Sequence, residues 1–187
     1  MIEQYISYIE KINETMKNTV VLKTIKKLNE DLIKLWEDNG TLYICGNGGS
    51  AGNAIHIAND YVYGIGKGIK KGLKTHALTA NTSIITCLAN DLKYEHIFSE
   101  QIKLFGQEKD ILLALSGSGN SINIINAIKE CKKKKMITHA IIGYDGGEII
   151  NLADNAIHVK INDMQIAEDS QLIINHMIMQ NLAGYKK

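Results

Sequence analysis

The chain has 187 residues, a formal net charge of +1 at pH 7, three cysteines and no proline. This length suits one domain with a full hydrophobic core, and the near-neutral charge gives no reason to expect a nucleic acid or a membrane surface as partner. An odd number of cysteines without framework spacing points to a reducing compartment, the first residues lack the pattern of a signal peptide, and no apolar stretch approaches the roughly 20 residues that span a bilayer. We therefore expect a cytoplasmic protein.

Two helices are predicted before any strand. Apolar residues recur at helical spacing over 2–16 and again over 21–35, a break falls near Asn18-Thr19, and Asn39-Gly40 ends the second helix. A sheet unit does not need this helical pair to cover it. We therefore expect residues 1–38 to bury their apolar stripes against other copies of the chain, as an oligomerisation segment.

Strands and helices alternate through the remaining residues, 39–187. The predicted strands are 41–45, 75–79, 110–115, 137–142 and 156–160, and the predicted helices are 50–63, 82–91, 94–105, 121–134 and 164–183. Such alternation predicts a parallel sheet covered by helices on both faces, in the α/β class. The sequence shows no linker or repeat, so we expect a single domain over 1–187.

Two loops each follow a predicted strand and open a predicted helix. The first is Gly46-Asn47-Gly48-Gly49-Ser50 and the second is Ser116-Gly117-Ser118-Gly119-Asn120-Ser121. Backbone N–H groups at a helix N-terminus favour anions, and the three serine hydroxyls of the second loop suit the oxygens of a phosphate monoester. Because ligands bind beyond the carboxyl ends of parallel strands, both loops are expected to serve one pocket for a phosphorylated small molecule.

The glycines of the first loop allow two other interpretations. Gly46, Gly48 and Ala51 match the G-x-G-x-x-A pattern of dinucleotide sites. That site also needs an acidic residue at the end of the second strand, and 75–81 contains none, so we expect no nucleotide cofactor. The glycines can also serve tight turns alone, which explains one such loop more easily than two.

Four ionisable side chains fall on two predicted helices. His56 and Asp60 are four residues apart and share a helix face, while Glu168 and His176 are eight apart, about two turns. Two histidines and two carboxylates can hold one divalent ion or act as acid and base. Spacing alone leaves open whether each pair is only a helix-surface contact, and whether Asn90-Asp91, at a helix end between the two loops, is more than a helix stop.

The motifs in order resemble the sugar isomerase (SIS) domain family, and within it the phosphoheptose isomerases. The residues that carry the resemblance are Cys45-Gly46-Asn47-Gly48-Gly49-Ser50-Ala51, Ala80-Asn81-Thr82-Ser83, Ala89-Asn90-Asp91, Ser116-Gly117-Ser118-Gly119-Asn120-Ser121 and Asp145-Gly146-Gly147. The resemblance implies a flavodoxin-like three-layer sandwich with a five-stranded parallel sheet and two extra N-terminal helices. It also implies a homotetramer that interconverts sedoheptulose 7-phosphate and a heptose 7-phosphate, which feeds nucleotide-activated heptose for surface polysaccharide.

The resemblance also implies roles for individual residues. One zinc ion per subunit is expected on His56, Asp60, Glu168 and His176, with Asp60, His176 and Glu168 as candidate acid–base residues. The expected substrate-binding residues are Asn47, Gly48, Gly49, Ser50, Asn90, Asp91, Ser116, Gly117, Ser118, Asn120 and Ser121.

The sequence departs from the family at three of these positions. Asp60 stands where Glu is usual, Glu168 where Gln is usual, and Gly117 where Thr is usual. The choice between Asp60 and Glu168 as the base stays open for this reason. Some relatives with this domain are non-catalytic binding proteins, which associate with a replication initiator or sense sugar phosphates, and an isomerase of another ketose phosphate is a further alternative. The four ionisable side chains favour an enzyme.

Overall fold

The sheet has five parallel strands in the order β2-β1-β3-β4-β5. The computed structural model describes residues 1–67 and 71–185. The strands are β1 (Thr41–Gly46), β2 (Lys74–Ala77), β3 (Ile111–Ser116), β4 (Ile137–Ile142) and β5 (Asn155–His158). This strand order is that of flavodoxin-like folds, in which the switch point lies between β1 and β3. The predicted fold class is therefore confirmed.

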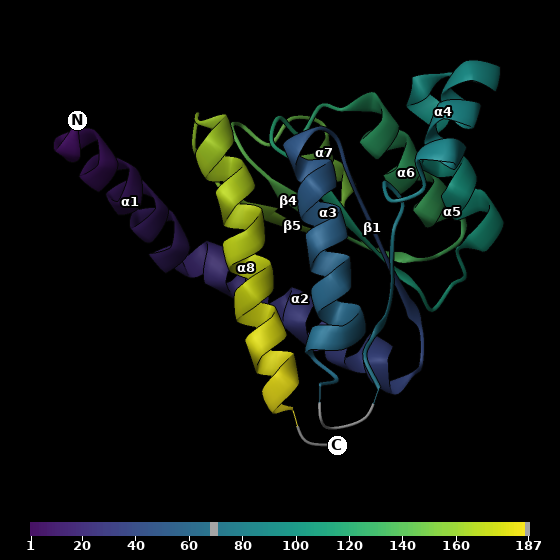
Figure 1. Cartoon of the computed structure of the whole chain (residues 1–187), viewed down its shortest axis with the longest axis horizontal. Coiled ribbons are helices and arrows are strands. Elements are labelled where there is room, and N and C mark those ends of the chain that lie inside the picture. The colour runs from purple at the N-terminus through teal and green to yellow at the C-terminus, as the bar shows by residue number, and fades with distance from the viewer. Residues whose placement is uncertain (68–70, 186–187) are drawn as a thin grey trace.

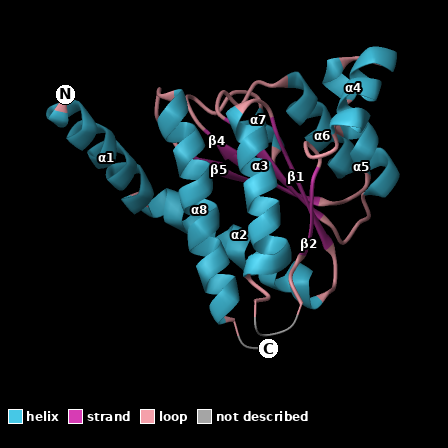
Figure 2. Ribbon diagram, in the orientation of Figure 1, coloured by secondary structure: helices cyan, strands magenta, loops and turns pink. Residues whose placement is uncertain are grey.

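Helices cover both faces of the sheet, as Figure 2 shows. The α-helices are α1 (Ile2–Lys17), α2 (Thr19–Glu37), α3 (Gly49–Asn59), α4 (Thr82–Asp91), α5 (Ser99–Phe105), α6 (Ile122–Lys133), α7 (Ile149–Leu152) and α8 (Met164–Gly184). In Figure 1, α3 and α8 stand side by side in front of the sheet, and α4, α5 and α6 lie at the other side of the molecule.

Alternate residues of the strands feed two hydrophobic cores, because successive side chains of a strand point to opposite faces. Leu113 of β3 packs with the apolar faces of α2, α3 and α8, whereas its neighbour Leu112 packs with α5 and α6. Both side chains are completely buried. The strands are therefore apolar on both faces, which the sequence shows as short continuous runs of Ile, Leu and Ala.

Helix α1 projects from the body of the molecule (Figures 1 and 2). None of its residues is buried, and its apolar stripe is open to solvent, with Ile2, Tyr5, Ile6 and Ile9 each at least half exposed. One hydrogen bond, 2.6 Å from the Tyr8 hydroxyl to Asp169 Oδ2, ties α1 to α8.

Several predicted elements differ in their bounds, and one helix was not predicted. The predicted helix 94–105 is a 3-10 turn, Tyr94–His96, followed by the separate α5. The predicted strand 75–79 is 74–77, because the chain turns after Ala77, with the Ala80 N–H donating to its carbonyl. Helix α7 has only four residues, which is too short for apolar periodicity to indicate.

Candidate active site

A π-helical turn carries the first candidate acid–base residue. The predicted helix 50–63 is α-helical only to Asn59, and Asp60–Gly64 form a π-helical turn in which the Ile65 N–H donates to the Asp60 carbonyl at 3.0 Å. The regular α-helical spacing before this turn puts Asp60 on the same side as His56, with Oδ2 3.4 Å from the His56 Nε2. Such turns within helices are frequent at functional sites.

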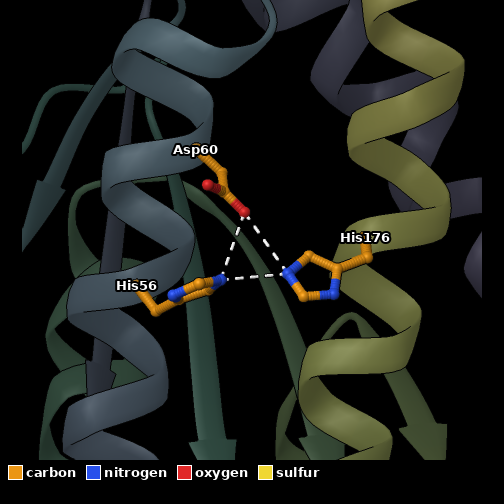
Figure 3. A group of neighbouring side chains, drawn as sticks. All are labelled: His56, Asp60 and His176. Atoms are coloured by element: carbon orange, nitrogen blue, oxygen red, sulfur yellow. Dashed lines mark hydrogen bonds and ion pairs between the residues drawn. The ribbon is translucent and has the colours of Figure 1, made fainter.

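Three side chains from two helices converge beside this turn (Figure 3). The Nε2 atoms of His56 and His176 lie 3.0 Å apart, and each lies 3.4 Å from Asp60 Oδ2. The carboxylate is the more buried partner, since 18% of the Asp60 side chain is exposed against 49% and 45% for the two imidazoles. The group is therefore open to a ligand from the histidine side.

A buried hydrogen bond joins the π-helical turn to α8. The Tyr61 hydroxyl, fully buried, donates to Asn175 Oδ1 at 2.9 Å, and Asn175 Nδ2 donates to the Gln171 carbonyl at 2.7 Å. Burial raises the pKa of the Tyr61 hydroxyl well above its ordinary value, so this group stays a neutral hydrogen-bond donor. These bonds connect the turn that carries Asp60 with the helix that carries His176.

The fourth expected ligand, Glu168, lies elsewhere. Its half-buried carboxylate packs against Gly49, where a Cβ atom would collide with it. Gly49, at the start of α3, contacts Glu168, and His56, about two turns later, contacts His176 of α8. Residue numbers increase along both helices in the same direction, so the two helices are parallel. Eight residues of helix span about 12 Å. The structure thus brings together three of the four expected metal ligands.

These three donors fit a zinc ion. Ligand atoms bound tetrahedrally at about 2.0–2.1 Å from zinc lie about 3.3 Å from one another, close to the 3.0, 3.4 and 3.4 Å seen here. Within the described residues, this is the group of His, Cys, Asp and Glu donors that converges closely enough for a metal ion. Two imidazoles and one carboxylate leave one position open, as catalytic zinc sites require.

The first loop presents its backbone at the start of α3. Gly48 precedes the helix with φ +55° and is exposed, as is Gly49. The Ser50 hydroxyl is 4% exposed and accepts a hydrogen bond of 3.0 Å from Gln171 Nε2. Ser50 therefore anchors the loop to α8, while the two glycines are the exposed part of the loop.

The second loop has one serine turned inward and two that are accessible. Ser116 is 4% exposed, and its hydroxyl accepts from the Gly119 N–H at 3.1 Å. The Ser118 hydroxyl accepts from the Asn120 N–H at 3.2 Å, while Ser121 begins α6 without a capping hydrogen bond from its side chain. Gly117 lies against Met164, whose sulfur occupies the space that a Cβ would take.

A hollow of about 530 Å³ adjoins the second loop. Its lining residues are Ser118, Asn120, Tyr144, Asp145, Lys160, Ile161 and Asn162.

Two other expected substrate-binding residues, Asn90 and Asp91, are exposed at the end of α4. Asn90 Nδ2 donates to Asp91 Oδ1 at 2.8 Å, which holds the pKa of the Asp91 carboxyl below its usual value. Neither side chain has a hydrogen bond to the two loops in the part of the chain that the structure describes.

The sequence did not reveal three residues whose side chains hydrogen-bond to the first loop. Gln171, Asn123 and Tyr94 each donate a hydrogen bond to a first-loop side chain. Gln171 and Asn123 are each 1% exposed, although both are polar residues of predicted helices. No motif marks them, because a buried amide is recognised only once its partners are known.

Comparison with known proteins places this geometry in a family. The profile of the SIS domain matches residues 4–143. The phosphoheptose isomerase of Aneurinibacillus thermoaerophilus is 37% identical over 158 residues, which cover 84% of this chain and 79% of that protein. The chain belongs to the SIS-domain family, among the phosphoheptose isomerases. That of Clostridium acetobutylicum is 35% identical over 172 residues, 92% of this chain and 87% of that protein.

Solved phosphoheptose isomerases share the whole fold. The structure of GmhA from Neisseria gonorrhoeae has a TM-score of 0.90 at 27% identity, and that of the enzyme from Francisella tularensis has a TM-score of 0.92 at 26% identity. Each comparison covers 98% of this chain and 97% of the other. As a member of this family the chain is an aldose–ketose isomerase of phosphorylated sugars.

In the described ranges, no helix combines the length and apolarity needed to cross a bilayer.

Proposed function

We propose that this chain converts D-sedoheptulose 7-phosphate to D-glycero-D-manno-heptose 7-phosphate through an enediol(ate), as a step toward nucleotide-activated heptose. The observation that carries the proposal is the convergence of His56, Asp60 and His176 beside the helix that the first loop opens. A base and an imidazole at 3.4 Å can serve both the carbon and the oxygen atoms of one substrate.

The proposed reaction moves protons between two carbons and two oxygens. Asp60 removes a proton from C1 of the ketose while the C2 oxygen gains one, which gives the enediol(ate). The proton then returns to C2 and the C1 oxygen loses its proton, which gives the aldose. His176, beside the same carboxylate, exchanges the protons of the two oxygens. This assignment follows the geometry, since the Glu168 carboxylate packs against Gly49 instead.

The other end of the substrate is proposed to bind the loops. The accessible hydroxyls of Ser118 and Ser121, with backbone N–H groups at the start of α6, suit the phosphate. Binding energy from this remote group orients the carbonyl end for reaction. We propose that the exposed Gly48 and Gly49 of the first loop also contact the substrate, and that Asn90, Asp91, Asn120 and Gly117 complete the binding set.

We propose one zinc ion per subunit on His56, Asp60 and His176; the fourth residue of the expected set, Glu168, lies against Gly49, about two helical turns from His176. When bound, the ion would polarise the substrate carbonyl as a Lewis acid. The spacing of the three donor atoms suits such an ion.

The remaining proposals concern assembly and location. The exposed apolar stripe of α1 supports a homotetramer in which residues 1–38 bury that stripe against other copies. The three cysteines, Cys45, Cys87 and Cys131, are all free, which supports a reducing, cytoplasmic location. A net charge of +1 supports neither nucleic acid nor a membrane as partner.

Turnover of sedoheptulose 7-phosphate by the purified chain tests the proposed function. Proton exchange with solvent at C1 and C2, followed by NMR in D2O, reports the enediol(ate) even where equilibrium favours the ketose. We expect exchange and aldose formation together. Binding of the sugar phosphate without exchange would instead support a sugar-phosphate-sensing protein, and a screen of other ketose phosphates would then identify or exclude another isomerase activity.

A further inference from the structure

A network of three side chains joins the first loop to the helix that follows the second loop. Asn123 lies in the first turn of α6 and is 1% exposed. Its Nδ2 donates to Asn47 Oδ1 at 2.8 Å, and Asn47 Nδ2 donates back to Asn123 Oδ1 at 2.9 Å. The Tyr94 hydroxyl, from the 3-10 turn, donates to the same Asn47 oxygen at 2.9 Å.

The network uses most of the hydrogen-bonding capacity of Asn47. A primary amide offers two acceptor lone pairs and two donor hydrogens. The oxygen of Asn47 accepts from Tyr94 and Asn123, and one of its two N–H donors binds Asn123. The Asn123 oxygen also accepts from the Ile124 N–H at 3.0 Å. The Asn47 amide therefore has one N–H left for a ligand, and its main partners are protein groups.

The network connects opposite layers of the molecule. The first loop leads into α3, which packs on one face of the sheet, and α6 packs on the other face. Asn47 directly precedes Gly48, whose φ of +55° turns the backbone into α3. Because Gly48 is conformationally free, its N–H direction depends on what holds its neighbours. The amide pair supplies that restraint from the side of α6.

We propose that Asn47, Asn123 and Tyr94 are positioning residues that hold the two loops at the separation and orientation a phosphorylated sugar spans. This inference rests on the proposed function, in which phosphate binds the second loop and the sugar extends toward the first. Inorganic phosphate needs only the second loop. Loosening the network therefore weakens binding of the sugar phosphate and leaves binding of inorganic phosphate unchanged.

Tyr94→Phe is the sharpest variant, because it removes one hydroxyl from a residue that is 54% exposed and so spares the core. Its matched control is Tyr185→Phe, which removes a hydroxyl that donates to Glu37 Oε1 at 2.8 Å at the far end of α8. For Tyr94→Phe we expect KM for sedoheptulose 7-phosphate to rise roughly 3- to 10-fold. We expect kcat and the inhibition constant of inorganic phosphate to stay unchanged, and the control to match wild type.

A double-mutant cycle tests whether Tyr94 acts through Asn47. Asn47→Ala is expected to raise KM at least as much as Tyr94→Phe, and adding Tyr94→Phe to Asn47→Ala is expected to change KM no further. If the increases in KM of the two single variants multiply in the double variant, the two residues act separately and the proposal is overturned. A fall in kcat at constant KM, or an equal loss of affinity for inorganic phosphate, would also overturn it.

The outcomes also separate this inference from the proposed function. Turnover by wild type with an unchanged KM in Tyr94→Phe overturns the positioning role alone. A wild-type chain that neither binds nor turns over the sugar phosphate, measured by calorimetric titration and NMR, overturns the proposed substrate and with it the inference. Because Asn123 is buried, the kinetics of Asn123→Ala should be read together with its thermal unfolding curve. If Asn123→Ala does not fold, Tyr94→Phe still decides the test.

Discussion

The carboxylate of Glu168 occupies the space that a Cβ atom on residue 49 would fill. This contact sets Glu168 beside the first turn of α3, where N–H groups favour a negative charge. Asp60, in contrast, lies 3.4 Å from both His56 and His176. Of the two carboxylates that the sequence leaves as candidate bases, the geometry favours Asp60.

Asp60→Asn and Glu168→Gln should therefore differ sharply. Asp60→Asn keeps the shape of the side chain but removes the base, so we expect kcat to fall by about 10²- to 10⁴-fold. Glu168→Gln keeps the packing against Gly49, so we expect kcat near that of wild type. Steady-state kinetics with sedoheptulose 7-phosphate measure both, and the reverse order of activities would assign the base to Glu168.

Ser121→Ala is expected to weaken substrate binding. Among the described residues its hydroxyl makes no capping bond to α6, so it is available for the proposed hydrogen bond to the charged phosphate, which the substitution would remove. A loss of about 1.5–3 kcal/mol corresponds to roughly a 10- to 150-fold rise in KM with little change in kcat.

Ser116→Ala serves as the comparison within the same loop. The Ser116 hydroxyl accepts from the Gly119 N–H inside the protein, so we expect this variant to lower thermal stability as well as affinity. Unchanged KM in an active Ser121→Ala enzyme would contradict the proposed phosphate contact.

Removal of one histidine should release the metal. His176→Ala leaves two donors of the three, and we expect its zinc content, measured by elemental analysis after purification without added metal or chelator, to fall far below one ion per chain. His76→Ala is the control, because His76 is exposed and stacks on Tyr43, 5.9 Å between ring centroids. Wild-type protein that is fully active without bound metal would contradict the zinc proposal.

A charge on the exposed stripe of α1 should disrupt assembly. Ile6 and Ile9 are 50% and 65% exposed in the single chain, so Ile6→Glu or Ile9→Glu is tolerated by the monomer fold and disfavoured in an apolar interface. Light scattering at micromolar concentration is expected to give a tetramer for wild type and smaller species for either variant. A monodisperse wild-type monomer would refute the proposed assembly.

Stability in acid should depend on Asp31, which joins α2 to β4. Burial alone raises the pKa of this carboxyl, but the contact with His139, Nε2 to Oδ2 at 3.0 Å, and the hydrogen bond from Lys27 outweigh burial and hold the pKa below its usual value. A group with a lowered folded-state pKa stabilises above its unfolded-state pKa, about 3.9, and that contribution disappears as the pH falls through the folded-state value.

The Asp31→Asn variant isolates this effect. We expect it to lower the free energy of unfolding by about 1.5–3 kcal/mol near neutral pH, and the difference from wild type to shrink below about pH 4. Chemical denaturation at several pH values measures the difference. A constant penalty down to pH 2 would show that packing, rather than the charge of Asp31, is responsible.

Most of the fold was predictable because its signals are local. Apolar runs such as 111–115 and the glycine-rich turns after β1 and β3 indicate strand, loop and helix within a few residues of one another. The π-helical turn at Asp60 and the four-residue α7 were not predictable, since each depends on contacts made by the finished tertiary structure.

The candidate site was predictable in its residues more than in its arrangement. Spacing of four placed His56 and Asp60 on one helix face, and the structure confirms their contact. Spacing of eight placed Glu168 and His176 on one helix, but it could not show which residues of α3 each of them contacts. Tyr94, Asn123 and Gln171 carry no local pattern, because their roles come from partners far away in sequence.

The π-helical turn begins at Asp60 itself. His56 lies on the regular part of α3 and His176 within the long α8. From Asp60 onward the helix widens, and the Ile65 N–H donates to the Asp60 carbonyl at 3.0 Å. The carboxylate proposed as the base therefore differs from both imidazoles in its backbone setting, because it stands at the residue where the helix changes type.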